Sequence, residues 1–186
     1  MTMQDFGALA EVINALAVIV TLVVLIASIR QNTQAQRVLA VESLTAAVTS
    51  INVPAMEAPE LGDAIATATR DWNSATRAQR ITAHYFLFCY FKLLETAWYQ
   101  RKAHTLDESQ WGGWEAMLLV YYHSPGIQEA WWPRRRSGFS QEFQAYLASS
   151  QKPEGISPLS ALFDDAASDR DSEVRNTTVE SATKPL

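Results

Sequence analysis

The chain has 186 residues, a formal net charge of −5 and a hydrophobic content of 48%. This length is enough for one domain with its own core. The acidic balance argues against nucleic acid as a partner, because affinity for nucleic acid depends on a basic surface. Cys89 is the single cysteine, which excludes an intramolecular disulfide framework and agrees with a reducing compartment.

Residues 12–29 form an uncharged apolar run, VINALAVIVTLVVLIASI, which Arg30 follows directly. A helix rises about 1.5 Å per residue, so this run and its apolar flank match a hydrocarbon core about 30 Å thick. A cleaved signal peptide is the main alternative, but residues 1–11 contain no Lys or Arg and Ile29 is too bulky for a cleavage site. The sequence therefore predicts a transmembrane anchor over residues 1–30.

The charges on the two sides of the anchor predict its orientation. Asp5 and Glu11 precede the apolar run, whereas Arg30 and Arg37 follow it. Lys and Arg favour the cytoplasmic side of a single span. We therefore expect the N-terminus outside and a cytoplasmic C-terminal domain.

Small and polar residues gather on one face of the anchor. Several of them recur every seven residues, and at roughly 100° per residue they project into one arc. Helices in a bilayer associate by close approach past small residues and by interhelical hydrogen bonds. We expect this face to contact a second copy or another membrane protein, unless it reflects only the usual composition of membrane helices. The predicted association face consists of Gly7, Ala10, Glu11, Asn14, Ala17, Thr21 and Ser28.

The anchor helix is predicted to continue into the body of the protein. Residues 31–53 contain no Gly or Pro, and Pro54 is the expected end because proline lacks an amide donor. Apolar residues in this stretch recur at spacings of three and four, which is typical of a helix face packed on a core. This stripe consists of Val41, Leu44, Val48 and Ile51.

A short helix over Leu61, Ile65 and Trp72 is predicted next. A long central helix follows, capped by Ser74 or Thr76. The apolar residues of the long helix fall on one stripe, so we expect it to form the centre of the core. That stripe comprises Ile81, Tyr85, Phe88, Phe91, Leu94 and Trp98.

Three more helices are predicted in the second half of the body. Thr105 and Glu108 have the spacing of a capping box, which opens the first. Ser124 precedes a proline and opens a short helix that Pro133 closes. Ser140 caps the last helix.

No stretch shows the alternation that a strand requires, so the predicted fold class is all-α. One N-terminal transmembrane helix continues into a small cytoplasmic helical domain, which covers residues 31–149. Residues 150–186 are rich in Ser, Asp, Thr and Pro and are predicted to be a disordered tail.

Residues suited to catalysis or metal binding form no motif. His84, His104 and His123 are not spaced to place two ligands on one helix face. His84 and Glu95 share one side of the central helix, where we expect each to be satisfied by its own neighbours. Cys89 lies among apolar residues and is expected to be buried and inert. We therefore expect no enzyme activity, no metal and no cofactor.

Residues 134–136 are three consecutive arginines that follow Trp131, Trp132 and Pro133. Tryptophan beside arginine is typical of a contact with lipid headgroups. Three charges are fewer than the roughly four to eight that mark lipid recognition. The interpretation we favour is that one tryptophan belongs to the core and that the arginines form a solvated turn that pairs with nearby acidic residues. The possible headgroup contact consists of Trp132, Arg134, Arg135 and Arg136.

Two parts of the chain resemble a known group of proteins. The start AEVINALAVIVTLVVLIASIRQNTQA, and the later elements ExxxYQ, LDExxW, SPG and WW, are similar to a widespread group of uncharacterised bacterial single-pass membrane proteins. The resemblance extends to about Leu147 and implies a bacterial inner membrane, but no activity, substrate or catalytic residue. Asn14 stands where that group is expected to have glycine, so the association face is more polar here.

These observations predict a membrane-anchored helical interaction or accessory protein, either a homo-oligomer or a subunit of a larger membrane complex. A small-molecule or lipid-sensing module is the alternative, because six Trp and six Tyr can line an apolar pocket. A pocket lined by Tyr85, Trp98 and Trp114 would favour the sensing module. A filled core would favour the interaction protein.

Overall fold

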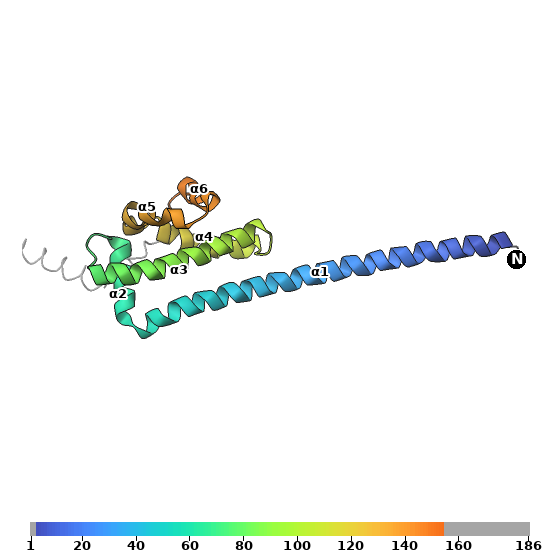
Figure 1. Cartoon of the computed structure of the whole chain (residues 1–186), viewed down its shortest axis with the longest axis horizontal. Coiled ribbons are helices and arrows are strands. Elements are labelled where there is room, and N and C mark those ends of the chain that lie inside the picture. Colours follow the sequence, from blue (N-terminus) through green and yellow to red (C-terminus); the bar gives the residue numbers. More distant parts are fainter. Residues whose placement is uncertain (1–2, 155–186) are drawn as a thin grey trace, which may run out of the picture.

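The computed structural model describes residues 3–154, which form helices joined by short loops (Figure 1). No strand occurs in this part of the chain, so the predicted all-α class is confirmed. The predicted disordered tail lies outside the described residues from residue 155 onward. The elements in chain order are α1 (Met3–Glu57), α2 (Pro59–Arg70), α3 (Arg77–Lys102), α4 (Glu108–Tyr122), the π-helix η1 (Gly126–Trp131), α5 (Trp132–Arg135), the 3-10 turn η2 (Arg136–Gly138) and α6 (Gln141–Ser149).

The helix α1 joins the predicted anchor to the domain without a break. It is about 80 Å long at 1.5 Å per residue, and the other helices lie along its C-terminal half (Figure 1). Its predicted end at Pro54 is wrong, since α1 runs on to Glu57. Proline removes one amide donor but keeps its carbonyl, which accepts from the amide of Ala58 at 3.0 Å.

The apolar stripe predicted in the second half of α1 packs on the domain. Leu44 is 1% exposed and belongs to the core, and Val41, Val48 and Ile51 are partly buried against it. The partners of this face are α2 and α3. The domain therefore uses α1 as one of its own helices, and the predicted domain boundary at residue 30 coincides with no break in the structure.

Predicted caps set the start of two helices. Thr76 and Gln79 form a reciprocal capping box at the start of α3, in which each side chain accepts from the backbone amide of the other residue. Ser140 caps α6 by accepting from the amide of Phe143 at 3.3 Å. Thr76, one of the two residues proposed for α3, is therefore confirmed as its cap, as is Ser140 for α6.

The predicted capping box of Thr105 and Glu108 is wrong. Asp107 caps α4 instead, and its carboxylate accepts from the amide of Ser109 at 2.9 Å. Glu108 forms an ion pair with Arg101, so its side chain does not turn back to close a box. α4 therefore begins directly after Asp107, whose carboxylate accepts a hydrogen bond from an amide of the first turn.

The chain between α4 and α6 departs furthest from the predicted structure. In η1 the amide of Trp132 donates to the carbonyl of Ile127, a bond across five residues. Pro133 does not close a helix but lies in the first turn of α5, where its missing amide costs no hydrogen bond. The Ser124 hydroxyl donates to the carbonyl of Val120 at 2.9 Å rather than capping η1.

An aromatic cluster forms the core between α3, η1 and the last helices. The ring centroid of Phe91 lies 5.2 Å from Trp131 and 5.6 Å from Trp132. Aromatic pairs at such distances add about 0.5 to 1.5 kcal/mol each beyond the burial of their area. The other large buried rings of this cluster belong to Trp98, Trp111, Phe139 and Phe143.

The predicted core stripe of α3 is correct only in its second half. Phe91 and Trp98 are buried, but Ile81 is exposed and Tyr85 is 68% exposed. Cys89 is exposed as well, which contradicts its expected burial. The first half of α3 has apolar residues on more than one side. The elements packed against it bury a different face from the predicted one. That buried face carries Ala83, Phe86 and Leu87.

Gly126 marks the closest approach between η1 and α2. A Cβ atom at this position would lie 2.0 Å from the carbonyl oxygen of Ala68 and 2.9 Å from the backbone nitrogen of Trp72. Backbone atoms cannot move aside as the end of a flexible side chain can, so only glycine fits. The close contact holds η1 against α2 and the loop that follows α2.

We expect Gly126→Ala to destabilise the domain by about 1 to 3 kcal/mol or more, because the added methyl group forces η1 and α2 apart. Gly113→Ala is the matched control, since nothing lies within 4 Å of an added Cβ at that exposed position in α4. The control should stabilise the domain by about 0.5 to 1 kcal/mol. Thermal unfolding of the detergent-solubilised protein measures both effects, and equal melting temperatures would contradict the contact.

Candidate functional site

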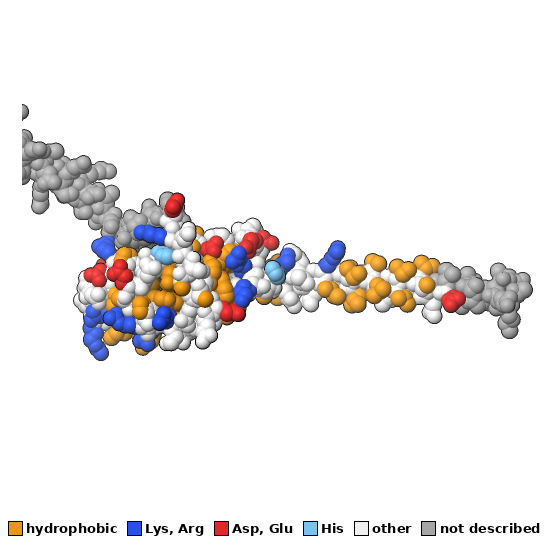
Figure 2. Space-filling view, turned by 90° about the horizontal axis from the view of Figure 1, so that it is seen from above, with side chains coloured by type: hydrophobic (Ala, Val, Ile, Leu, Met, Phe, Trp, Pro, Cys, Tyr) orange, Lys and Arg blue, Asp and Glu red, His pale blue; other side chains and the backbone are white. Residues whose placement is uncertain are grey.

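The helix α1 carries the predicted membrane anchor. Its segment Asn14–Pro54 includes a stretch that is long and apolar enough to cross a membrane, and no other helix in residues 3–154 does. None of that stretch is buried, and Figure 2 shows apolar side chains along this part of the helix. A continuous apolar surface of this kind marks a contact with a membrane or a protein.

The hydroxyl groups of the predicted association face are satisfied within α1. Thr21 donates to the carbonyl four residues earlier at 2.8 Å, and Ser28 does the same at 2.9 Å. Asn14 is exposed, and its side chain has no hydrogen bond to any described residue. Thr21 and Ser28 therefore present small side chains whose hydroxyl hydrogens are already bonded. Asn14 presents an amide without a hydrogen-bond partner among the described residues. Glu11 and Ala17 are also exposed, while the side chains of Gly7 and Ala10 lie outside the described residues.

Three residues of the predicted association face lie on the side of α1 opposite the domain, whereas Glu11 projects only about 60° from Leu44. A helix turns by about 100° per residue, so Ala17 projects about 180° away from Leu44, which is buried in the core. Thr21 and Ser28 project about 140° and 160° away from Leu44. Ala17, Thr21 and Ser28 therefore lie on a different side of α1 from the residues that pack on the domain.

The side of α1 that faces away from the domain stays uncovered beyond the apolar span. Eight exposed residues of the second half project within about 40° of the direction opposite Leu44, and four of them are the apolar residues Ala35, Leu39, Ala46 and Val53. Leu39 is the largest of them and is 62% exposed. Glu42 and Glu57 are the charged residues in this sector. We call this surface the outer stripe, and it comprises Ala17, Thr21, Ser28, Ala35, Leu39, Ala46 and Val53.

The structure corrects one part of the predicted headgroup contact. Trp132 is 6% exposed, and its ring centroid lies 5.0 Å from that of Phe139 and 5.6 Å from that of Phe91. Its indole is part of the core, because η1 and α5 turn both consecutive tryptophans inward. Residues 134–136 are exposed, as expected for a solvated turn, but the expected pairing with nearby acids is wrong, since none of the three forms an ion pair with a described residue.

The arginines of α5 lie at the end of the domain far from the anchor. α3 begins beside α2, at the C-terminal end of α1, and runs back toward the anchor (Figure 1). Arg134 and Arg135 border the same pocket as Arg77, the first residue of α3. About 40 Å of helix separates Arg30 from the end of α1 at Glu57. This position argues against a contact with headgroups of the membrane that α1 would cross.

Four arginines surround one pocket at this end of the domain. The pocket is a hollow of about 570 Å³ that opens to solvent, and Figure 2 shows basic side chains at this end. Arg77 and Arg80 come from the first turn of α3, and Arg134 and Arg135 come from α5. No carboxylate lines the pocket, and none of the four forms an ion pair with a described residue. We call this hollow the arginine pocket.

The arginines of α3 and those of α5 are far apart in the sequence, and only the packing of the helices brings them to one pocket. Arg77 and Arg80 have no local signal beyond their spacing of three, which places both on one face of α3. Trp72, from the loop between α2 and α3, and the core residue Trp131 also line the pocket. The close contact at Gly126 therefore helps to shape it, because that contact fixes η1 beside the backbone of Trp72.

His84 lines the arginine pocket and is oriented by a core tryptophan. Trp131 Nε1 donates to His84 Nδ1 at 3.1 Å, so the neutral imidazole carries its hydrogen on Nε2. Burial lowers the pKa of His84, and the positive charge of Arg135 lowers it further. His84 is therefore neutral at pH 7 and offers one N–H donor.

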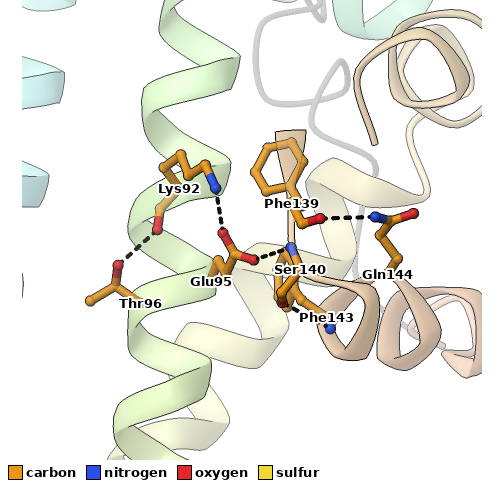
Figure 3. Close-up of polar contacts among 7 residues, drawn as sticks. All are labelled: Lys92, Glu95, Thr96, Phe139, Ser140, Phe143 and Gln144. Atoms are coloured by element: carbon orange, nitrogen blue, oxygen red, sulfur yellow. Dashed lines mark hydrogen bonds and ion pairs between the residues drawn. The ribbon is translucent and has the colours of Figure 1, made fainter. Parts of the chain in front are cut away.

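Glu95 is a buried carboxylate that ties α6 to α3. It is 6% exposed, and its two oxygens accept from the Ser140 amide at 2.7 Å and from Lys92 Nζ at 2.8 Å (Figure 3). Burial acts to raise the pKa of Glu95, but the hydrogen bonds from Lys92 and Ser140 outweigh it and hold the pKa below its ordinary value. His84 and Glu95 bond to separate neighbours, as expected, although Nε2 of His84 has no partner among the described residues.

The structure does not gather Tyr85, Trp98 and Trp114 around one pocket. Trp98 is buried in the aromatic core, with its ring centroid 5.7 Å from that of Phe143. Tyr85 lies at the arginine pocket, and Trp114 is a partly buried residue of α4 that packs against the core. Trp98 and Trp114 therefore do not join Tyr85 in lining the arginine pocket.

The remaining polar residues show no cluster suited to metal binding. No group of three His, Cys, Asp or Glu that could hold a metal ion occurs in residues 3–154. His123 Nε2 lies 3.1 Å from the Ser150 hydroxyl, and burial lowers the pKa of this histidine. His104 has a φ of 55° in the turn after α3, so it takes the left-handed conformation there.

No protein-family model, no curated protein and no solved structure matches the chain. The resemblance to a group of bacterial single-pass membrane proteins therefore stays a prediction. What the chain does has to follow from its own residues and their arrangement.

Glu95→Gln should lower the free energy of unfolding by about 1.5 to 3 kcal/mol at pH 7, because it removes the charge from two buried hydrogen bonds. The native pKa of Glu95 is lowered, so the stabilisation is complete above the ordinary carboxyl pKa and disappears as the pH falls through the native value. The difference between wild type and variant should therefore shrink as the pH falls below the ordinary carboxyl pKa and through the lower native pKa.

Glu142→Gln is the matched control for this prediction. Its carboxylate pairs with Lys102 at 2.7 Å on an exposed surface, and surface pairs contribute little. Chemical unfolding at a series of pH values gives the three stabilities. A stability difference for Glu95→Gln that is no smaller under acidic conditions than at pH 7 would contradict the assigned role of the carboxylate.

Proposed function

We propose that this chain is a single-span membrane protein that self-associates through α1 and holds a helical domain on the cytoplasmic side of a bacterial inner membrane. One observation carries the proposal: the outer stripe is uncovered along both the apolar span and the domain. In this proposal α1 makes the contact between two copies of the chain, and it holds the helical domain at the membrane.

The membrane part of the proposal is supported by the exposed apolar surface of α1. Ten large hydrophobic residues between Leu16 and Ile29 are more than half exposed. Contact between water and so much apolar surface is unfavourable, so a bilayer is the better environment for this segment. Arg30 and Arg37 follow this stretch, and their position supports a cytoplasmic domain. The resemblance to bacterial single-pass proteins supports the inner membrane as the location.

Self-association is supported by the geometry of the outer stripe. Two parallel copies of α1 can meet along it with both domains on the outside, because Leu44 faces the opposite way. Ala17 and Ala46 permit close approach of the backbones. Leu39 and Val53 add apolar contact beyond the membrane, and the spacing of seven among Leu39, Ala46 and Val53 suits a left-handed crossing. The negative charges of Glu42 and Glu57 in the same sector oppose it.

Cysteine cross-linking tests the proposed contact. In a Cys89→Ser background, Ala46→Cys should form an interchain disulfide in native membranes, because residues at the centre of a paired face bring their Cα atoms within about 4.4 to 6.8 Å. Thr45→Cys is the matched control, since Thr45 is equally exposed but projects only about 100° from Leu44. Non-reducing electrophoresis after mild oxidation measures both.

Strong cross-linking at Ala46→Cys and weak cross-linking at Thr45→Cys is the expected result. Equal cross-linking at the two positions would show random collision and contradict a specific face. No cross-linking at Ala46→Cys in chains that remain in the membrane would contradict self-association and leave the accessory-subunit function, in which α1 contacts a different membrane protein.

A further inference from the structure

We propose that the arginine pocket is a binding site for a small soluble molecule that carries phosphate groups. This site is separate from the outer stripe, because the pocket is lined by α3, η1, α5 and the loop before α3. The proposal does not depend on self-association of α1, and the two can fail independently.

The charge of the pocket points to an anionic ligand. Other basic residues of α3 are paired, as Lys92 is with Glu95, Arg101 with Glu108 and Lys102 with Glu142. The four arginines of the pocket are not paired with any described carboxylate. Like charges held together repel one another, and a bound anion relieves this repulsion. Such a concentration of positive charge stands out in a chain whose net charge is −5.

The chemistry of the donors favours phosphate over other anions. A guanidinium group presents a planar fork of N–H donors that fits a phosphate with two parallel hydrogen bonds. Arg134 is already oriented, since its Nη1 donates to the carbonyl of Ala130 at 3.1 Å. His84 adds the hydrogen on Nε2, which has no partner among the described residues.

The shape of the pocket fits a small molecule. Its volume of about 570 Å³ lies within the usual range of small-molecule sites, about 300 to 1,000 Å³. Trp72 and Tyr85 provide aromatic surface beside the arginines, and the buried Trp131 closes the core side. Two rigid elements carry the two arginine pairs, so the charges converge without a large rearrangement.

The place of the pocket favours a soluble source of phosphate over a lipid headgroup. The pocket lies at the end of the domain that is remote from the apolar span, with about 40 Å of α1 between Arg30 and Glu57. Electrostatic interactions in the cell are screened over about 8 Å. Headgroups of the membrane around the span are therefore out of reach of the pocket.

Inorganic pyrophosphate is the probe for this site. The full-length protein, in nanodiscs of phosphatidylcholine, is titrated with pyrophosphate by isothermal calorimetry at a fixed ionic strength. We expect saturable binding at one site per chain. The double variant Arg80→Gln/Arg135→Gln should weaken this binding at least tenfold, because it removes one fork from each side of the pocket.

Arg136→Gln is the matched control. Arg136 is exposed and adjacent to Arg135 but does not line the pocket, so its loss should change the affinity less than twofold. Arg80→Lys keeps the charge and loses the fork, and it should still weaken binding severalfold. The melting temperature of each variant is measured on the same samples, and we expect no change because these side chains lie outside the core.

Two results would overturn the proposal. Absence of saturable pyrophosphate binding would show that the pocket is not a phosphate site. An equal loss of affinity in Arg136→Gln and in the double variant would show only a general attraction to positive charge. In nanodiscs of anionic phosphatidylglycerol the affinity for pyrophosphate should be the same within twofold. A tenfold or greater loss there would show that lipid headgroups occupy the pocket, and the proposal of a soluble ligand would be wrong.

Discussion

A polypeptide backbone in a hydrocarbon layer must satisfy its own hydrogen bonds, and this constraint makes a helix of any single segment that crosses a bilayer. No glycine or proline interrupts residues 8–53, so the helix that suits the span continues into the domain as α1. One rigid element thereby carries Ala17 in the apolar span and Leu44 in the core. The phase of the helix places these two residues on opposite sides, which leaves the outer stripe free for a partner.

The domain that α1 presents is held by contacts that also shape its pocket. The aromatic core draws Trp131 and Trp132 inward, which leaves the arginines that follow them at the surface. Gly126 allows η1 to touch the backbone of α2, and this brings α5 beside the first turn of α3. Glu95 ties α6 to α3 at the other side of the core. Stability and the convergence of the arginines therefore depend on the same packing.

Local chemistry explains which features were predictable from the sequence. The caps Thr76 and Ser140, and the buried face around Leu44, follow from nearby spacing and hydrogen bonds, and they are correct. The first half of α3 has apolar residues on several sides, so only contacts distant in sequence decide that Tyr85 is exposed. The π-helix η1 has no sequence signature, and burial of Trp132 follows from it. The arginine pocket joins two helices that are far apart in the chain, which no local pattern reveals.

The continuity of α1 from the apolar span into the domain can be measured directly by double electron–electron resonance. Spin labels are placed at Ser28→Cys and Thr49→Cys in a Cys89→Ser background, and the labelled chain is diluted with unlabelled chain in nanodiscs. An unbroken helix separates these positions by about 30 Å and gives one narrow distance distribution. A broad distribution, or one centred well below about 30 Å, would show a break between the span and the domain and contradict a single rigid helix.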